Sequence, residues 1–141
     1  MTGQAVRLAG MCRDCQKSCE GWAVQLVKEG RLRWEVEWAC DDCGNSHDAG
    51  WGPAPDDVRQ LILNEYGLYR LRLEHADRPG GKALKAFREA LAMTIKQAQG
   101  AAAELAADGY RGTFVEVSLV AKLLNKSGVN TTVRPDGSTD T

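Results

Sequence analysis

The first part of the chain alternates between apolar and charged positions, which predicts a β-hairpin. From position 32 to 38 every second side chain is apolar, namely Leu32, Trp34, Val36 and Trp38. A period of two is typical of a half-buried strand. Residues 21–27 supply the partner strand, and 28–30 supply the turn between them. We therefore expect an antiparallel pair in which Trp34 packs inside.

The rest of the chain has apolar positions at helical intervals. Residues 56–66 predict a short helix, and residues 68–73 predict a strand. Two further helices follow, with the apolar stripes Leu84, Phe87 and Leu91, then Ile95, Ala98, Ala102 and Leu105. Thr94 is suited to cap the second of them, so the division falls near 92–94.

A capping box predicts a third helix. Thr113 and Glu116 are spaced so that each side chain satisfies a free backbone N–H of the other residue. The buried positions of this helix would be Val117, Val120, Ala121 and Leu124. Gly128 would end it, and residues 129–133 would form a closing strand. The polar tail 135–141 is expected to be disordered.

The cysteines have the spacing of a metal site. Two residues separate Cys12 from Cys15 and Cys40 from Cys43, and 24 residues lie between the pairs. Two such turns at one end of a hairpin can complete a tetrahedron of sulfurs. Gly44 fits a turn in which backbone amides donate to thiolates. This chemistry favours a structural Zn²⁺, although a mononuclear iron site uses the same ligands.

Cys19 and His47 are left outside this set of four ligands. Either is an alternative ligand, and His47 in place of Cys43 is the more natural exchange. A surface or packing role is the simpler interpretation of both. A segment of about forty residues buries too little apolar surface to fold alone, so metal binding would contribute to its folding.

These patterns together predict an α+β protein. We expect a zinc β-ribbon over residues 1–52, a linker and connecting helix over 53–67, and a βαααβ domain over 68–134, with the disordered tail after it. All four tryptophans lie in the ribbon, which indicates an apolar interface with the second part.

The composition excludes several classes of protein. The chain is 43% hydrophobic and 26% charged, with a formal net charge of −1, which argues against nucleic-acid binding by bulk charge. No stretch approaches the roughly 18 apolar residues of a membrane span, and residues 1–11 lack a secretory core. We expect a cytoplasmic protein, in which disulfides are disfavoured. An enzyme is not expected, because no catalytic set or nucleotide motif occurs.

Two short motifs resemble a known family, at residues 84–88 (LKAFR) and 93–98 (MTIKQA). They look like the C-terminal domain of the bacterial large-subunit ribosomal stalk protein and its structural relative, the ClpS-type adaptor of the Clp protease. The resemblance spans residues 68–133 and includes the order of the elements. In the stalk family, basic residues on the first two helices dock translational GTPases. The matching residues here are Lys85, Arg88 and Lys96, with Lys82 nearby.

The chain departs from both relatives. The Gly-Leu-Gly turn of the stalk family is AMT here, at residues 92–94, and the zinc ribbon occupies the place of the dimerising N-terminal domain. The ClpS pocket for a free N-terminus uses an Asn-Asp-Asp run and a later His. This chain has HAD at 75–77 and Ala106 at the later position. Recognition of N-terminal residues is therefore not expected.

The resemblance implies a non-catalytic zinc-binding adaptor that docks a translation factor or a protease component through these basic residues. A solvated helix face explains the same cations equally well. The alternative is a nucleic-acid-binding zinc-ribbon regulator that uses Arg31 and Arg33 near the hairpin tip. A third hypothesis is a redox or metal sensor in which loss of the metal unfolds the ribbon.

Overall fold

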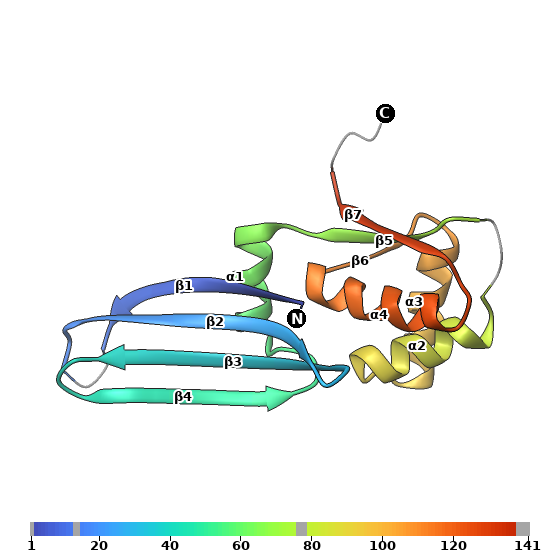
Figure 1. The fold of residues 1–141 in the computed structure, drawn as a ribbon. Coiled ribbons are helices and arrows are strands. Elements are labelled where there is room, and N and C mark those ends of the chain that lie inside the picture. Colours follow the sequence, from blue (N-terminus) through green and yellow to red (C-terminus); the bar gives the residue numbers. More distant parts are fainter. Residues whose placement is uncertain (1, 13–14, 76–78, 138–141) are drawn as a thin grey trace.

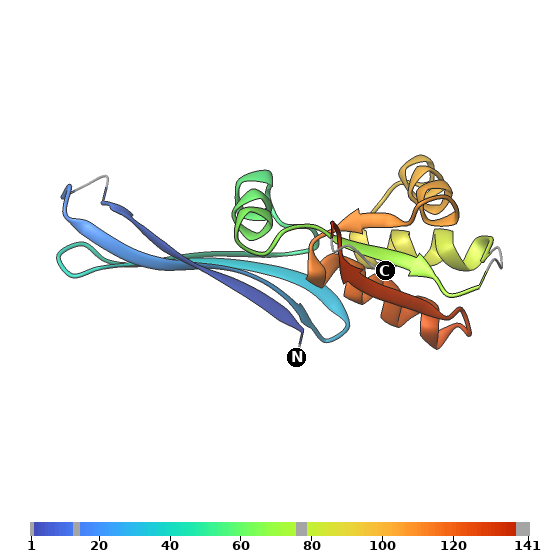
Figure 2. The ribbon, with the colours of Figure 1, turned by 90° about the horizontal axis from the view of Figure 1, so that it is seen from above.

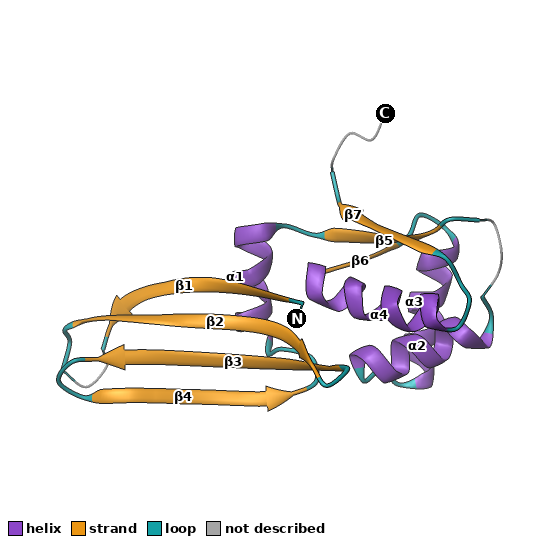
Figure 3. Ribbon diagram, in the orientation of Figure 1, coloured by secondary structure: helices purple, strands orange, loops and turns teal. Residues whose placement is uncertain are grey.

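The computed structural model describes residues 2–12, 15–75 and 79–137, and within them the protein is α+β (Figures 1 and 3). Two antiparallel sheets and four helices are present in these ranges. The far half of the larger sheet extends beyond all the helices as a long arm (Figure 2). No helix in the described ranges is long and apolar enough to cross a membrane.

The larger sheet is a meander with the strand order β1-β2-β3-β4. Its strands are β1 (Gly3–Met11), β2 (Ser18–Lys28), β3 (Arg31–Cys40) and β4 (Gly44–Trp51). The predicted hairpin is confirmed as β2 and β3, which pair from Lys28 opposite Arg31. Glu29 and Gly30 between them have φ of 54° and 74°, as a tight two-residue hairpin turn requires.

The hairpin prediction includes neither β1 nor β4, and the composition of these strands explains why. β4 has the sequence GNSHDAGW, in which no apolar face alternates with a polar one, and most of its residues are exposed. β1 buries only Gln4 and Val6 fully. Both edge strands form by pairing with the central hairpin rather than through an apolar pattern of their own.

The smaller sheet has the order β6-β5-β7 and packs against the helices of the second part. Its strands are β5 (Tyr69–Leu73), β6 (Tyr110–Gly112) and β7 (Thr131–Pro135). The helices of the protein are α1 (Asp56–Tyr66), α2 (Gly81–Leu91), α3 (Ile95–Ala106) and α4 (Phe114–Lys126). Leu71, Phe87 and Val120 are fully buried where β5, α2 and α4 meet. The Tyr110 ring meets Phe87 edge-on at 4.8 Å.

Both predicted helix starts are confirmed. The Thr94 hydroxyl accepts a hydrogen bond from the Gln97 amide at 3.1 Å, and the Gln97 side chain accepts one from the Thr94 amide at 2.9 Å. Thr113 and Glu116 form the same reciprocal pair at 3.1 and 2.9 Å. Ala92 adopts a left-handed φ of 54°, which ends α2 and separates it from α3.

The second part differs from its prediction in two places. The strand β6 lies between α3 and α4, so the order is β-α-α-β-α-β rather than βαααβ. A strand of three residues is too short to show a period. The start of the tail is ordered, contrary to the expected disorder of residues 135–141. The strand β7 extends to Pro135, and Asp136 accepts hydrogen bonds from Arg70 and Arg111 at 2.9 and 3.0 Å. Residues 138–141 of that tail lie outside the described residues.

The segment expected to be a linker is packed. Ala54 is buried together with Ala23 of β2 and Val58 of α1, and Trp34 packs against this cluster. Leu32 of β3 is buried in the core of the second part. The two parts therefore share an apolar interface, as the concentration of tryptophan indicated, although Leu32 rather than an indole enters the common core.

A buried polar network joins β2, α1 and α4 at this interface. The Glu116 carboxylate, 4% exposed, accepts hydrogen bonds from the Arg59 guanidinium at 2.8 and 3.0 Å and from the Thr113 amide at 2.9 Å. Gln25 donates to Glu116 at 3.4 Å and accepts from the Thr113 hydroxyl at 2.5 Å. Because a buried charge needs such partners, this network fixes how the arm meets the helical part.

Glu116→Gln is expected to lower the free energy of unfolding by about 3 kcal/mol, because it leaves the Arg59 charge half-buried without a counter-ion. Urea denaturation of the purified protein measures this loss. Glu104→Gln, on the exposed side of α3, is the control and should change stability little. Equal effects of the two substitutions would show that the network does not hold the interface.

The Asp136 ion pairs predict a pH-dependent loss of stability. Burial alone would raise the pKa of Asp136, but the hydrogen bond and charge of Arg70 and the charge of Arg111 outweigh it and lower the pKa. The stabilisation is therefore present above the unfolded value of about 4 and lost as the pH falls below it. Because the stabilisation disappears only as the pH falls through the lower pKa of the folded state, Asp136→Asn should cost about 1 kcal/mol at pH 7 and clearly less at pH 3 in thermal or urea unfolding. A cost that is the same at both pH values would contradict the pairing.

Candidate metal centre

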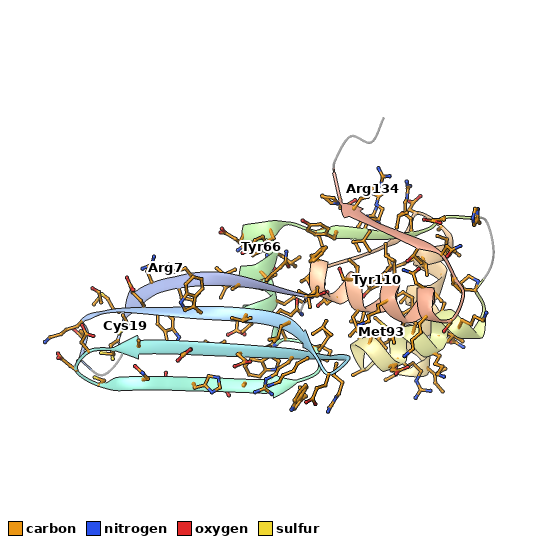
Figure 4. The ribbon with its side chains drawn as sticks, viewed as in Figure 1. Arg7, Cys19, Tyr66, Met93, Tyr110 and Arg134 are labelled. Atoms are coloured by element: carbon orange, nitrogen blue, oxygen red, sulfur yellow. The ribbon has the colours of Figure 1, made fainter. Side chains whose placement is uncertain are left out.

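The four predicted ligands lie at or between strand ends, at the free end of the larger sheet. Cys12 follows β1 and Cys15 precedes β2, whereas Cys40 ends β3 and Cys43 precedes β4. Because β2 and β3 are paired neighbours, the turn that enters β2 and the turn that leaves β3 meet there. Figure 4 shows the neighbouring Cys19 at this end, far from the helices.

The sulfur atoms are placed as a metal ion would require. The Sγ atoms of Cys12 and Cys43 are 3.6 Å apart, those of Cys15 and Cys40 are 3.4 Å apart, and all four lie within 4.8 Å of one another. Four sulfurs about 2.3 Å from a tetrahedral ion would be about 3.8 Å apart. The observed separations are far longer than a disulfide bond of about 2.05 Å. The group can therefore hold one metal ion.

Backbone amides in both turns point at the sulfurs. The amides of Cys43 and Asp42 hydrogen-bond to Cys40 and lower the pKa of its thiol to about 6. The Lys17 amide favours the Cys15 thiolate in the same way, but the hydrogen bond with Cys40 and burial outweigh it and raise the pKa of Cys15. These amides are the outer contacts that orient thiolate ligands toward a metal.

The thiols of this group share their protons unequally, because hydrogen bonds among them favour the thiolate at Cys40 and the protonated thiol at Cys43. Hydrogen bonds with Cys15 and Cys12, together with burial, raise the pKa of Cys43 above its ordinary value. In the absence of a cation, four adjacent thiolates would repel one another. A divalent cation removes this repulsion and releases the protons, so binding of the metal and ionisation of the ligands are coupled.

The two alternative ligands lie outside the group of four sulfurs. Cys19 is buried, its thiol donates to the Lys17 carbonyl at 3.6 Å, and burial with the nearby Cys40 raises its pKa to about 12. His47 lies 3.1 Å from the Glu35 carboxylate. Among the described residues, the structure thus brings together the four cysteines predicted from spacing, rather than a set in which His47 or Cys19 replaces one of them.

The four predicted partner-binding residues are spread over more than one surface. Lys85 and Arg88 line a shallow groove of about 760 Å³ between α2 and α3. Lys82 lines a separate hollow near Gly128, and Lys96 is exposed at the start of α3. Whether they bind a partner stays a prediction.

The apolar side chains of the groove were not identified from the sequence. Its floor includes Leu84, Met93 and Ile95, and we call this surface, with Lys85 and Arg88, the α2–α3 groove. Ile95 is 56% exposed, although its helical spacing predicts a buried position. Ile95 is the first residue of α3, directly after its Thr94 cap.

The chemistry of the donor set fits a structural zinc ion, and the identity of the metal stays a prediction. Four cysteines would fill all positions of a tetrahedral ion. Comparison of the chain with protein-family models, curated proteins and solved structures finds no match. The stalk-family resemblance therefore stays a prediction as well.

The purified chain is expected to contain one zinc ion, which Cys15→Ser/Cys40→Ser should remove. Elemental analysis by plasma mass spectrometry measures the metal, and the melting temperature of the variant should fall because the ion contributes to folding. Cys19→Ser is the matched control and should keep its zinc. Full zinc content in the double variant would refute the assigned ligands, and iron in its place would refute the assigned metal.

Proposed function

We propose that this chain is a non-catalytic zinc-binding adaptor, in which zinc closes the free end of the larger sheet and the α2–α3 groove docks a protein partner. The supporting observation is the group of four cysteine sulfurs within 4.8 Å of one another. A metal held by four cysteines has no open position for a substrate or water. Its role is therefore to stabilise the fold, in a reducing compartment where thiols stay free to bind it.

The chemistry of the α2–α3 groove supports a protein partner with an acidic, amphipathic segment. The floor offers Leu84, Met93 and Ile95 to apolar side chains, and an amphipathic helix docks on such surfaces. Lys85 and Arg88 offer positive charge to acidic side chains at the rim, which speeds association and selects the partner. The stalk-family resemblance favours a translation factor or a protease component in this role.

A second candidate function is binding of single-stranded nucleic acid. The guanidinium groups of Arg31 and Arg33 lie 4.6 and 4.8 Å from the centre of the Trp51 ring, and Trp51 is 42% exposed. Exposed aromatic rings beside cations can stack bases and neutralise phosphates. Arg33 also pairs with Glu35 at 3.2 Å, however, which leaves less positive charge for a phosphate. We therefore favour the adaptor.

Charge reversal in the groove is expected to abolish capture of the partner. A pull-down from nuclease-treated host lysate compares the unaltered chain with Lys85→Glu/Arg88→Glu, and the amount of captured partner should fall at least tenfold. The control is Lys122→Glu/Lys126→Glu, which makes the same charge change at exposed positions of α4.

Equal capture by the groove variant and the unaltered chain would contradict the adaptor function. Binding of oligonucleotides that is strong at low salt and lost in Arg33→Glu would instead support the nucleic-acid function. Circular dichroism of each variant confirms that the fold is intact in this comparison.

A further inference from the structure

A pocket of about 440 Å³ opens onto the metal centre, since Cys12, Cys40 and Cys43 form part of its wall, and it lies at the opposite end of the molecule from the α2–α3 groove. Apart from these ligand cysteines, it is lined by Met11, Cys19, Trp38, Gly44, Asn45 and Ser46. The proposed adaptor function makes no use of this pocket. Its lining combines an indole, two sulfur-containing side chains and two neutral polar side chains.

The Trp38 indole packs over two glycines, one on β1 and one on β2. A Cβ atom at Gly10 of β1 would be 3.4 Å from the ring, and one at Gly21 of β2 would be 3.1 Å from it. The six-membered ring therefore lies against backbone that carries no side chain, and the same indole lines the pocket. An indole held in this way loses little conformational entropy on binding a ligand.

The surroundings of the pocket are negatively charged. Asp41 and Asp42 lie in the turn between two ligand cysteines, and Asp48 follows on β4. Within the described residues 10–12, 15–20 and 38–48, Lys17 is the only lysine or arginine, and it is paired with Asp42. Four thiolates around a divalent ion would add two further negative charges. A phosphate would be repelled here and a cation attracted.

We propose that this pocket binds the lysine or arginine side chain of a basic peptide segment, with its cation over the Trp38 indole. A cation within about 6 Å of an indole face is attracted by the negative charge of the ring, and tryptophan is the best of the aromatic residues in this role. Asn45 and Ser46 can accept hydrogen bonds from the ammonium or guanidinium group. The apolar part of the side chain would lie along Met11.

The test is a titration of the zinc-loaded full chain into a fluorescein-labelled octapeptide of alternating lysine, arginine and serine, followed by fluorescence anisotropy. Trp38→Leu, which keeps an apolar side chain over the glycines, should weaken binding about tenfold. Trp22→Leu is the matched control, because Trp22 is 48% exposed on a position of β2 that does not line the pocket. It should bind as tightly as the unaltered chain.

A second measurement keeps the proposal testable if Trp38→Leu does not fold. In the unaltered chain, the indole N–H resonance of Trp38, assigned with Trp38→Phe, should shift on addition of the peptide, and that of Trp22 should not. Two competing ligands are compared with the basic peptide: a peptide in which glutamate replaces every lysine and arginine, and oligothymidine. The proposal is overturned if either of them binds more tightly than the basic peptide. It is also overturned if Trp38 does not respond, or if the chain alone dimerises through Trp38, because a second copy would then fill the pocket.

Discussion

The Glu116 carboxylate is the point on which the arrangement of the protein depends. Arg59 of α1 and Gln25 of β2 both reach it, and Thr113 holds it at the start of α4. Glycine at position 112 leaves room for this carboxylate, since a Cβ atom on Gly112 would lie 2.7 Å from the Oε1 atom of Glu116. A carboxylate in this setting is stable only when each element is in place, so one residue joins the arm, the connecting helix and the helical part.

This join leaves the two ends of the protein far apart. The distal half of the arm extends beyond α1 and is far from the helices (Figures 1 and 2), so it has no second layer to bury its turns. A metal held by Cys12, Cys15, Cys40 and Cys43 would supply there the stability that packing supplies elsewhere. The groove formed by α2 and α3 lies at the other end, where Met93 is seen in Figure 4.

Features encoded by neighbouring residues could be predicted from the sequence, whereas those formed by distant ones could not. The hairpin, the Thr94 cap, the Thr113–Glu116 capping box and the set of four cysteines follow from local spacing, and the structure contains them. Gln25 occupies a position that local pattern cannot explain, because its partner Thr113 is 88 residues away. The strands β1, β4 and β6 were missed since pairing, rather than an apolar period, creates them.

The central claim is that four cysteine sulfurs form a closed zinc centre at the end of the arm. X-ray absorption at the zinc edge of the purified protein tests it most directly, because it reports the atoms bound to the metal and their distances. The account predicts four sulfur atoms at about 2.3 Å and no lighter ligand. A nitrogen or oxygen atom in the first shell, as His47 or water would contribute, would contradict it.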